Sequence, residues 1–267
     1  MPHQHITGLN PQQFATLLTA LNNYLTWRKP DTKPRRLTLT QALKITLLYH
    51  RYNLTEDFLA YIFSISQPTV SRTINLIEKT LDKVLQPVVQ PLEKALEVPG
   101  SLVIDGTLIP TWNWRSQGKT NFSGKHKKAG FNHQIICTID GKLLAITDSL
   151  PGARHDAYAF RVHGLERYLD DTTLADKGYV GLGLLTPVKR RSGVKMPKAV
   201  KDNNRVINGL RSVVERVIGN IKTWRVLHTG FRRPLDVYGR VFAVVRGLIF
   251  FAAGYPLLIS LDVVEIR

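Results

Sequence analysis

The most informative stretch of the chain reads Ser101-Leu102-Val103-Ile104-Asp105-Gly106-Thr107-Leu108-Ile109, an apolar and β-branched run that carries a single acid. This composition predicts a β-strand. A carboxylate inside a buried strand is costly unless it is paired with a cation or binds a metal ion. Asp105 is therefore the first candidate functional residue.

The residues that follow predict an α/β domain around this strand. Residues 133–140 and 143–149 are two further apolar strands, and Asp140-Gly141 between them is a strong signal for a two-residue hairpin. Residues 155–169 then have the apolar period of a helix. Strands and helices in this order are typical of a sheet flanked by helices.

Two more acids stand out in the second half of the chain. Residues 172–179 predict a short strand that ends on Asp176. Glu215 is the only acid in a predicted helix over residues 206–224, where it lies beside the apolar stripe. Gly219, four residues further on, places no side chain over this carboxylate, which leaves room for a large ligand.

Two strand acids and one helix acid can converge on divalent cations. Hard oxygen ligands suit Mg²⁺, which also takes phosphate oxygens as ligands. Two such ions about 4 Å apart can clamp the attacking and leaving oxygens of a phosphoryl displacement. Each acid taken alone could equally be a local salt-bridge partner, but three of them in a strongly basic chain favour a metal site.

Residues 37–85 predict a helical domain that binds DNA. Thr40, Thr55 and Ser66 are expected to cap three successive helices, and Pro68 would lie in the first turn of the third. In a helix-turn-helix, early polar residues of the last helix reach base edges in the major groove. An ordinary helical hairpin uses similar caps, so this alternative stays open at the level of the pattern.

The rest of the chain completes the predicted domain organisation. Residues 1–36 are expected to form an N-terminal helical segment. Prolines at 87, 91 and 99 predict a linker over residues 86–100, which leaves residues 101–267 as a second domain.

Charge is the outlying feature of the composition. The 267 residues hold 37 Lys and Arg against 20 Asp and Glu, a formal net charge of +17 with a pI near 10.1. Residues 181–240 alone hold 14 basic and 3 acidic residues, and no acid lies between Asp105 and Asp140. This concentration favours contact with nucleic-acid phosphates over a solvated basic face.

Two other features exclude classes of protein. A single cysteine, Cys137, excludes a disulfide framework and a cysteine-based zinc site, and it suits a reducing cytosol. The apolar stretch over residues 241–260 is interrupted by Arg246 and Pro256, so we expect a buried helix and no membrane span. We therefore expect a cytoplasmic, nucleoid-associated protein without a membrane partner.

Six blocks of the chain occur in the order of a known family. They are VIDGT with Asp105, FSGKHKKAGFNHQ, PGARHDAYAF, LADKGYVG with Asp176, TPVKR, and VVERVIGNIKTWRVL with Glu215. Together with the predicted helix-turn-helix, they resemble the DDE transposases of bacterial insertion sequences, in particular the insertion-sequence-five superfamily, which is similar to Harbinger-type transposases. The resemblance covers residues 37–250.

The resemblance implies a ribonuclease H-like fold for residues 101–267, with a mixed sheet flanked by helices. It implies that Asp105, Asp176 and Glu215 are both the catalytic residues and the ligands of two Mg²⁺ ions, for which Mn²⁺ substitutes. It also implies hydrolysis of phosphodiesters at transposon ends and attack of the freed 3′-hydroxyls on target DNA. Asp156 is not counted among the metal ligands.

Several basic and polar residues are candidate contacts to double-stranded DNA. In the helix-turn-helix, Val70, Ile74 and Ile77 are expected to face inward, and the outward residues are Gln67, Thr69, Ser71 and Arg72. In the second domain, the expected phosphate contacts are Lys125, His126, Lys127, Lys128, Lys177, Lys189, Arg190, Arg191, Lys222 and Arg225. The alternative for Lys125 to Lys128 is a solvated hairpin tip.

Three further residues are candidate accessory groups. His155 could touch the scissile phosphate or cap the helix that it precedes. Trp112 and Trp114 could stack on a flipped base, and packing under a loop is the alternative.

The leading hypothesis is an active DNA transposase that binds terminal inverted repeats and acts as a homodimer or larger assembly. The alternatives are a domesticated DNA-binding protein that has kept the fold, and a stand-alone metal-dependent nuclease. Retention of all three carboxylates argues against the first alternative, whereas the second uses the same kind of site.

Overall fold

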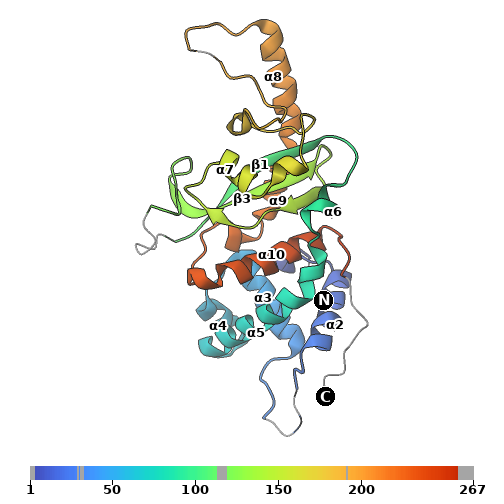
Figure 1. Cartoon of the computed structure of the whole chain (residues 1–267). Coiled ribbons are helices and arrows are strands. Elements are labelled where there is room, and N and C mark those ends of the chain that lie inside the picture. Colours follow the sequence, from blue (N-terminus) through green and yellow to red (C-terminus); the bar gives the residue numbers. More distant parts are fainter. Residues whose placement is uncertain (1–3, 29, 31–32, 113–118, 191, 258–267) are drawn as a thin grey trace. The chain divides into compact units, whose positions relative to one another are not determined.

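The computed structural model describes residues 4–28, 30, 33–112, 119–190 and 192–257 (Figure 1). These residues form two compact units. The helical unit comprises the described residues within 4–89, 223–229 and 233–257, and the sheet unit comprises those within 90–222 and 230–232.

The helical unit contains the three helices predicted over residues 37–85. Its described elements are α1 (Gln4–Thr7), α2 (Pro11–Tyr24), α3 (Leu39–Tyr52), α4 (Glu56–Phe63), α5 (Gln67–Leu85), the 3-10 helices η1 (Gln86–Val88), η5 (Arg225–Leu227) and η6 (Leu235–Val237), and α10 (Tyr238–Ala252).

The caps of these helices agree with the sequence in one case and differ in two. Thr55 caps α4 and accepts a hydrogen bond from the Phe58 amide, as predicted. The cap of α3 is Thr38 and not Thr40, because Gln41 completes a capping box with Thr38. Ser66 precedes α5, but its hydroxyl pairs with the Thr69 hydroxyl and makes no capping bond.

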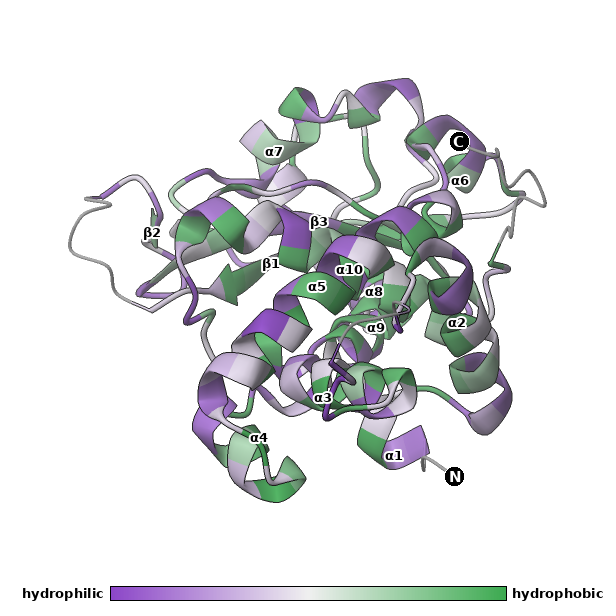
Figure 2. Cartoon of the chain, turned by 90° about the horizontal axis from the view of Figure 1, so that it is seen from below, coloured by the Kyte–Doolittle hydropathy of each residue, from purple (hydrophilic) through white to green (hydrophobic). Residues whose placement is uncertain are grey.

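Helix α10 is the buried helix expected in the apolar C-terminal stretch. It packs against α5 (Figure 2), and Gly247 lies so close to Leu85 that a Cβ at residue 247 would stand 2.6 Å from the Leu85 Cβ. Leu248 and Phe250 of α10 are also buried. Within the described part of the chain, no helix is long and apolar enough to cross a membrane.

A charged network lies inside the helical unit. Glu78 on α5 is fully buried, and its carboxylate pairs with Arg233 and with His50 of α3, whose Nε2 lies 3.3 Å away. Arg233 also donates a hydrogen bond of 2.7 Å to Asn75. Burial alone would raise the pKa of Glu78, but the hydrogen bonds and charges of His50 and Arg233 outweigh it and lower this pKa to about 2. The network therefore fixes α5 to α3 and to the segment before α10.

The sheet unit is built on two long antiparallel strands. Its described elements are α6 (Leu92–Leu96), β1 (Leu102–Pro110), β2 (Phe122–Ser123), β3 (Lys128–Thr138), β4 (Leu143–Ile146), β5 (Leu150–Pro151), α7 (Asp156–Val162), the 3-10 helices η3 (Leu165–Arg167) and η4 (Lys177–Tyr179), α8 (Lys198–Arg211) and α9 (Val213–Ile221). Strand β3 pairs with β1, β2, β4 and β5, always in antiparallel orientation.

Parallel pairing occurs only as isolated bridges among the described residues. Leu174 bridges to Val103 of β1 and to Leu185, so the strand predicted over residues 172–179 is reduced to single bridges followed by η4. The structure is thus a mixed α/β unit with five antiparallel strands and flanking helices. The ribonuclease H-like assignment stays a prediction.

Three predicted segments differ in the structure. The predicted linker over residues 86–100 contains η1 and α6, since its apolar residues Val88 and Leu96 are buried. The predicted helix over residues 206–224 is divided at Ser212, whose hydroxyl bonds back to the Gly209 carbonyl, so α8 and α9 are separate helices. Helix α7 ends at Val162, well before residue 169.

The compact units also divide the chain differently from the predicted domain limits. Residues 233–257 fall in the helical unit because α10 packs on α5, whereas the sequence pattern placed them in a domain over residues 101–267. Within the sheet unit, Figure 1 shows α8 projecting away from β1 and β3.

We expect the replacement Arg233→Ala to lower the free energy of unfolding by about 3–5 kcal/mol, because it leaves the buried Glu78 carboxylate without its cation. The double variant E78L/R233M removes both charges and should recover most of this loss. Urea denaturation measures both effects. Lys83→Ala, at an exposed position of the same helix α5, is the control. A decrease in the free energy of unfolding of less than about 1 kcal/mol for R233A would contradict this account of the network.

Candidate active site

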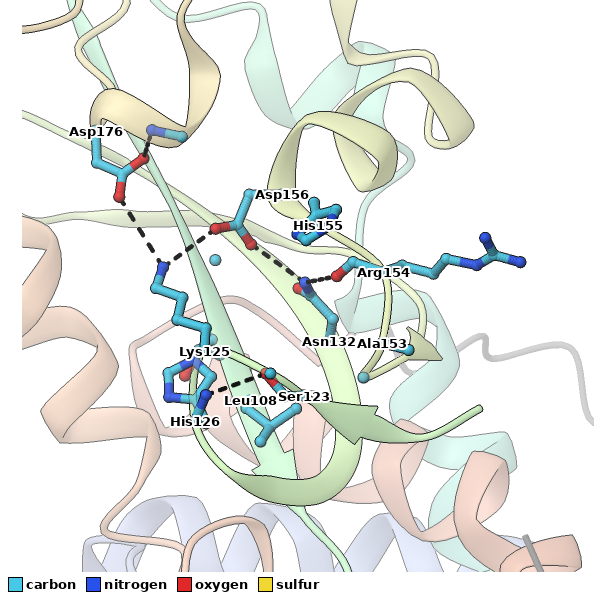
Figure 3. Close-up of a pocket in the computed structure, with 15 residues that line it drawn as sticks. Leu108, Ser123, Lys125, His126, Asn132, Ala153, Arg154, His155, Asp156 and Asp176 are labelled. Atoms are coloured by element: carbon cyan, nitrogen blue, oxygen red, sulfur yellow. Dashed lines mark hydrogen bonds and ion pairs between the residues drawn. The ribbon is translucent and has the colours of Figure 1, made fainter. Parts of the chain in front are cut away.

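A pocket of about 430 Å³ opens in the sheet unit beside residues 106–108 of β1 (Figure 3). Strand β1, the β2–β3 turn, the start of α7 and the segment around η4 all contribute to it. The residues that carry its chemistry are Lys125, His126, Asn132, His155, Asp156 and Asp176.

Asp105 lies in the middle of β1, paired in register with Ile135 of β3. Its carboxylate accepts hydrogen bonds from the Gly106 amide at 2.9 Å and from Arg211 Nη1 at 2.8 Å. Burial raises the pKa of Asp105 above its ordinary value and the charge of Asp176 adds to this, whereas Arg211 and Lys125 oppose it. Asp105 is therefore a largely buried acid compensated by cations. Its role as a metal ligand stays a prediction.

Asp176 stands at the N-terminus of η4, where its Oδ1 accepts a hydrogen bond of 2.6 Å from the Gly178 amide. Its other oxygen, Oδ2, lies 4.0 Å from the Lys125 ammonium. This carboxylate lines the pocket and is close enough to Asp105 for the two charges to interact.

Glu215 is placed differently from the two aspartates. It lies in the first turn of α9 with 65% of its side chain exposed, whereas the side chain of Asp105 is 15% exposed and that of Asp176 is 27% exposed. Of the three acids, Asp176 lines the pocket. Arg211 links Glu215 to Asp105, because Nη2 lies 3.5 Å from Glu215 while Nη1 lies 2.8 Å from Asp105. The structure thus brings the charges of Asp105 and Asp176 within reach of each other and connects Glu215 to Asp105 through Arg211.

The donor set fits a hard divalent cation in its chemistry, since the three predicted ligands are carboxylates. Among the residues that the structure describes, no group of three or more His, Cys, Asp and Glu side chains has the arrangement of a formed metal site. Instead, Arg211 stands between Asp105 and Glu215, and Lys125 stands between Asp156 and Asp176. In this structure, the side chains of Arg211 and Lys125 therefore supply the positive charge next to these carboxylates.

Asp156 lies in the pocket, although sequence reasoning did not include it among the candidate site residues. It begins α7, and its Oδ2 lies 3.3 Å from Lys125 Nζ while its Oδ1 accepts a 3.1 Å hydrogen bond from Asn132 (Figure 3). An acid at the start of a helix is typical of helix capping, so its position in the chain gave no reason to place it in a pocket. The one signal in the sequence is the glycine that follows Asp105. The structure gives its reason, because a Cβ at residue 106 would stand 2.0 Å from Asp156 Oδ1.

A chain of buried polar side chains leads to Asp156. The Tyr179 hydroxyl donates a short hydrogen bond to Gln134, Gln134 Nε2 donates to Asn132 at 3.0 Å, and Asn132 Nδ2 donates to Asp156. Tyr179 and Gln134 are fully buried. Burial raises the pKa of Tyr179 well above its ordinary value, and the nearby acids add to this, so its proton stays available for donation.

The basic residues predicted around the site are separated in the structure. Lys125 and His126 line the pocket, and burial followed by the charge of Lys125 lowers the pKa of His126. Lys222 is half-buried and burial lowers its pKa. The remaining described members are exposed, namely Lys127, Lys128, Lys177, Lys189, Arg190 and Arg225. Arg225 belongs to the helical unit, and Arg191 lies outside the described residues.

The predicted recognition residues lie in the first turns of α5. Val70, Ile74 and Ile77 are buried as expected. Arg72 is exposed, whereas Gln67, Thr69 and Ser71 are half-buried. Gln67 donates its amide proton to Glu56 of α4, which holds the two helices together.

The structure describes two of the three candidate accessory residues, His155 and Trp112. His155 lines the pocket and its backbone precedes α7, but its side chain makes no capping hydrogen bond. Trp112 is 59% exposed, and its backbone amide donates to the Phe231 carbonyl. Trp114 lies outside the described residues.

We expect Gly106→Ala to displace Asp156, since the new methyl group would occupy the position of its carboxylate. Loss of the Asn132 hydrogen bond and the Lys125 contact should lower the free energy of unfolding by about 1–3 kcal/mol, measured by chemical denaturation. Gly124→Ala is the matched control, because no atom lies within 4 Å of a Cβ there, and its effect should stay within about 0.5 kcal/mol. Equal stabilities for the two variants would contradict the close approach of Gly106 and Asp156.

Comparison with known proteins now gives the family. A family model described as DDE superfamily endonuclease matches residues 104–249, and a model described as the helix-turn-helix of DDE superfamily endonuclease matches residues 35–87. A protein of Streptomyces albus G, named as a transposase for insertion sequence element IS112, is 30% identical over 243 residues, which cover 90% of this chain and 91% of the relative.

A second relative, from Microchaete diplosiphon, is named as a transposase for insertion sequence element IS702. It is 27% identical over 241 residues, which cover 83% of each chain. No solved structure matches the chain. The family predicted from the sequence blocks is confirmed: the chain belongs to the DDE superfamily endonucleases and carries the helix-turn-helix domain of that superfamily.

Proposed function

We propose that this protein is an active DNA transposase that recognises the terminal inverted repeats of its element, cleaves phosphodiester bonds there and joins the 3′-hydroxyl ends to target DNA. The observation that carries the proposal is the proximity of Asp105 to Asp176, which lines the basic pocket, with Glu215 linked to Asp105 through Arg211. The names of both relatives support transposition as the setting of this chemistry.

Asp105, Asp176 and Glu215 would hold two divalent ions, Mg²⁺ or Mn²⁺, and are the residues that we propose as catalytic. When bound, such ions polarise the scissile phosphate and lower the pKa of water or of a 3′-hydroxyl that attacks it. The chain itself supplies the orientation of these carboxylates through β1, η4 and α9. A ribonuclease H-like arrangement of the sheet unit is part of this proposal.

The pocket also supplies groups for the DNA strand. Lys125 and His126 line it, and Lys127 in the same turn and Lys128 at the start of β3 are exposed cations. We assign these residues, together with Lys177 and Lys222, to phosphate contacts that hold the strand at the carboxylates. His155 lines the same pocket and could contact the scissile phosphate.

The helical unit would supply sequence recognition. The family match over residues 35–87 and the exposed Arg72 in the first turns of α5 support insertion of this helix into the major groove. Because two element ends must be brought together, we propose that the protein acts as a homodimer or larger assembly on DNA. A cytoplasmic, nucleoid-associated location fits this activity.

A stand-alone metal-dependent nuclease remains the second candidate. The same carboxylate site favours it equally, because cleavage and strand transfer use the same donor set. A cleavage reaction that never joins a 3′-end to target DNA would favour the nuclease.

We expect Asp105→Asn, Asp176→Asn and Glu215→Gln each to reduce Mg²⁺-dependent cleavage of terminal-repeat DNA by about a hundredfold or more, while DNA binding changes little. Asp170→Asn is the control, since this exposed acid accepts hydrogen bonds from Thr172 in its own turn. Gel assays of nicking and of binding measure the two properties. Undiminished cleavage by any of the three variants removes that residue from the site.

We expect Arg72→Ala to weaken discrimination for the terminal repeat over random DNA by about 1–3 kcal/mol, because it removes a contact to base edges. Lys79→Ala, an exposed position further along α5, should weaken binding to both DNAs equally or not at all. Competition binding at one fixed salt concentration measures the ratio. Equal losses on both DNAs for R72A would assign Arg72 to phosphate contacts.

A further inference from the structure

The most unusual feature of the pocket is the position of Lys125. Its ammonium lies 3.3 Å from Asp156 Oδ2 and 4.0 Å from Asp176 Oδ2. The charge of Asp105 also reaches it. One of the three acids that we propose as metal ligands is therefore neutralised, in the protein alone, by a side chain from the β2–β3 turn.

Asp156 is the fixed member of this pair. Its side chain is only 13% exposed, and Asn132 holds its Oδ1 from the opposite side. Asn132 is itself oriented by Gln134 and Tyr179, whose hydrogen bonds all point toward the carboxylate. Such a buried and fully paired chain gives Asp156 a single position.

Lys125 is the movable member. Its side chain is 59% exposed and lies on a turn, so the ammonium can leave without disturbing the sheet. An ammonium on a flexible stem loses little when it exchanges one anionic partner for another. The pair thus joins a rigid carboxylate to a mobile cation at the edge of the proposed metal site.

We propose that the Lys125 ammonium is a built-in counter-ion of the active site and that Asp156 is the positioning residue that holds this ammonium near Asp176. Divalent cations then compete with Lys125 for the Asp176 carboxylate. The proposal rests on the proposed function and adds a regulation of that site. Metal loading would free the ammonium from Asp176 for a phosphate of the DNA strand. By linkage, whatever draws Lys125 away, such as bound DNA, would tighten metal binding by the same factor.

The competing interpretation is an ordinary surface ion pair, which would contribute little and would not affect a metal ion. The two interpretations differ in one observable, the affinity of the DNA-free protein for a divalent cation. A counter-ion opposes metal binding, so its removal must tighten that binding. A structural ion pair or a pure phosphate contact predicts no such change.

The experiment uses the DNA-free full chain and Mn²⁺, with free Mn²⁺ measured by electron paramagnetic resonance at fixed salt. We expect Lys125→Gln to tighten Mn²⁺ binding about fivefold or more, because a positive charge leaves the immediate surroundings of the ion. Lys128→Gln removes the same charge from the neighbouring strand end and should change the affinity less than about twofold. The role of Asp156 is tested by repeating the Lys125→Gln change in the Asp156→Asn background, where its effect should fall below about twofold.

The outcomes separate the inference from the proposed function. Unchanged Mn²⁺ affinity in K125Q, with binding that is lost in D105N/D176N, overturns the counter-ion and leaves the metal site standing. An equal effect of K125Q with and without Asp156 overturns the positioning role of Asp156. Mn²⁺ binding that persists in D105N/D176N overturns both the inference and the proposed metal ligands.

Discussion

Burial of most of the Asp105 side chain in strand β1 is the constraint on which the sheet unit depends. Asp105 in β1 cannot remain charged there without compensation, and Arg211 supplies it at 2.8 Å. Because Arg211 ends α8 and also contacts Glu215, the same ion pair ties α9 and its acid to β1. The electrostatic need of one strand residue therefore helps to position a residue more than a hundred positions away in the chain.

The Asp156 carboxylate in the pocket is also compensated by a cation and fixed by a neighbouring side chain. Gly106, directly after Asp105, leaves the space that the Asp156 carboxylate occupies, and Asn132 on the paired strand β3 holds that carboxylate in place. Lys125 then spans Asp156 and Asp176. Two residues of this strongly basic chain, Arg211 and Lys125, thus lie next to the acids that we propose for metal binding.

The sequence predicted features whose causes are local, and it failed where distant contacts decide. The strand around Asp105, the helix caps at Thr55 and the inward faces of Val70, Ile74 and Ile77 follow from composition and period, and the structure agrees. Thr40 was the wrong cap because the capping box of Thr38 was not recognised. Asp156 was missed because its partners Lys125 and Asn132 lie 31 and 24 residues away, and the placement of α10 beside α5 is equally nonlocal.

Iron(II) bound in place of Mg²⁺ offers the most direct test that Asp105, Asp176 and Glu215 form one metal site. With ascorbate and peroxide it generates hydroxyl radicals that cut the polypeptide beside the ion, and the fragments are identified by mass spectrometry. We expect cuts in β1 near residue 105, near residue 176 and in α9 near residue 215, all of them lost in the D105N/D176N variant. Cuts confined to other segments, or unchanged in that variant, would contradict a metal site built from these three carboxylates.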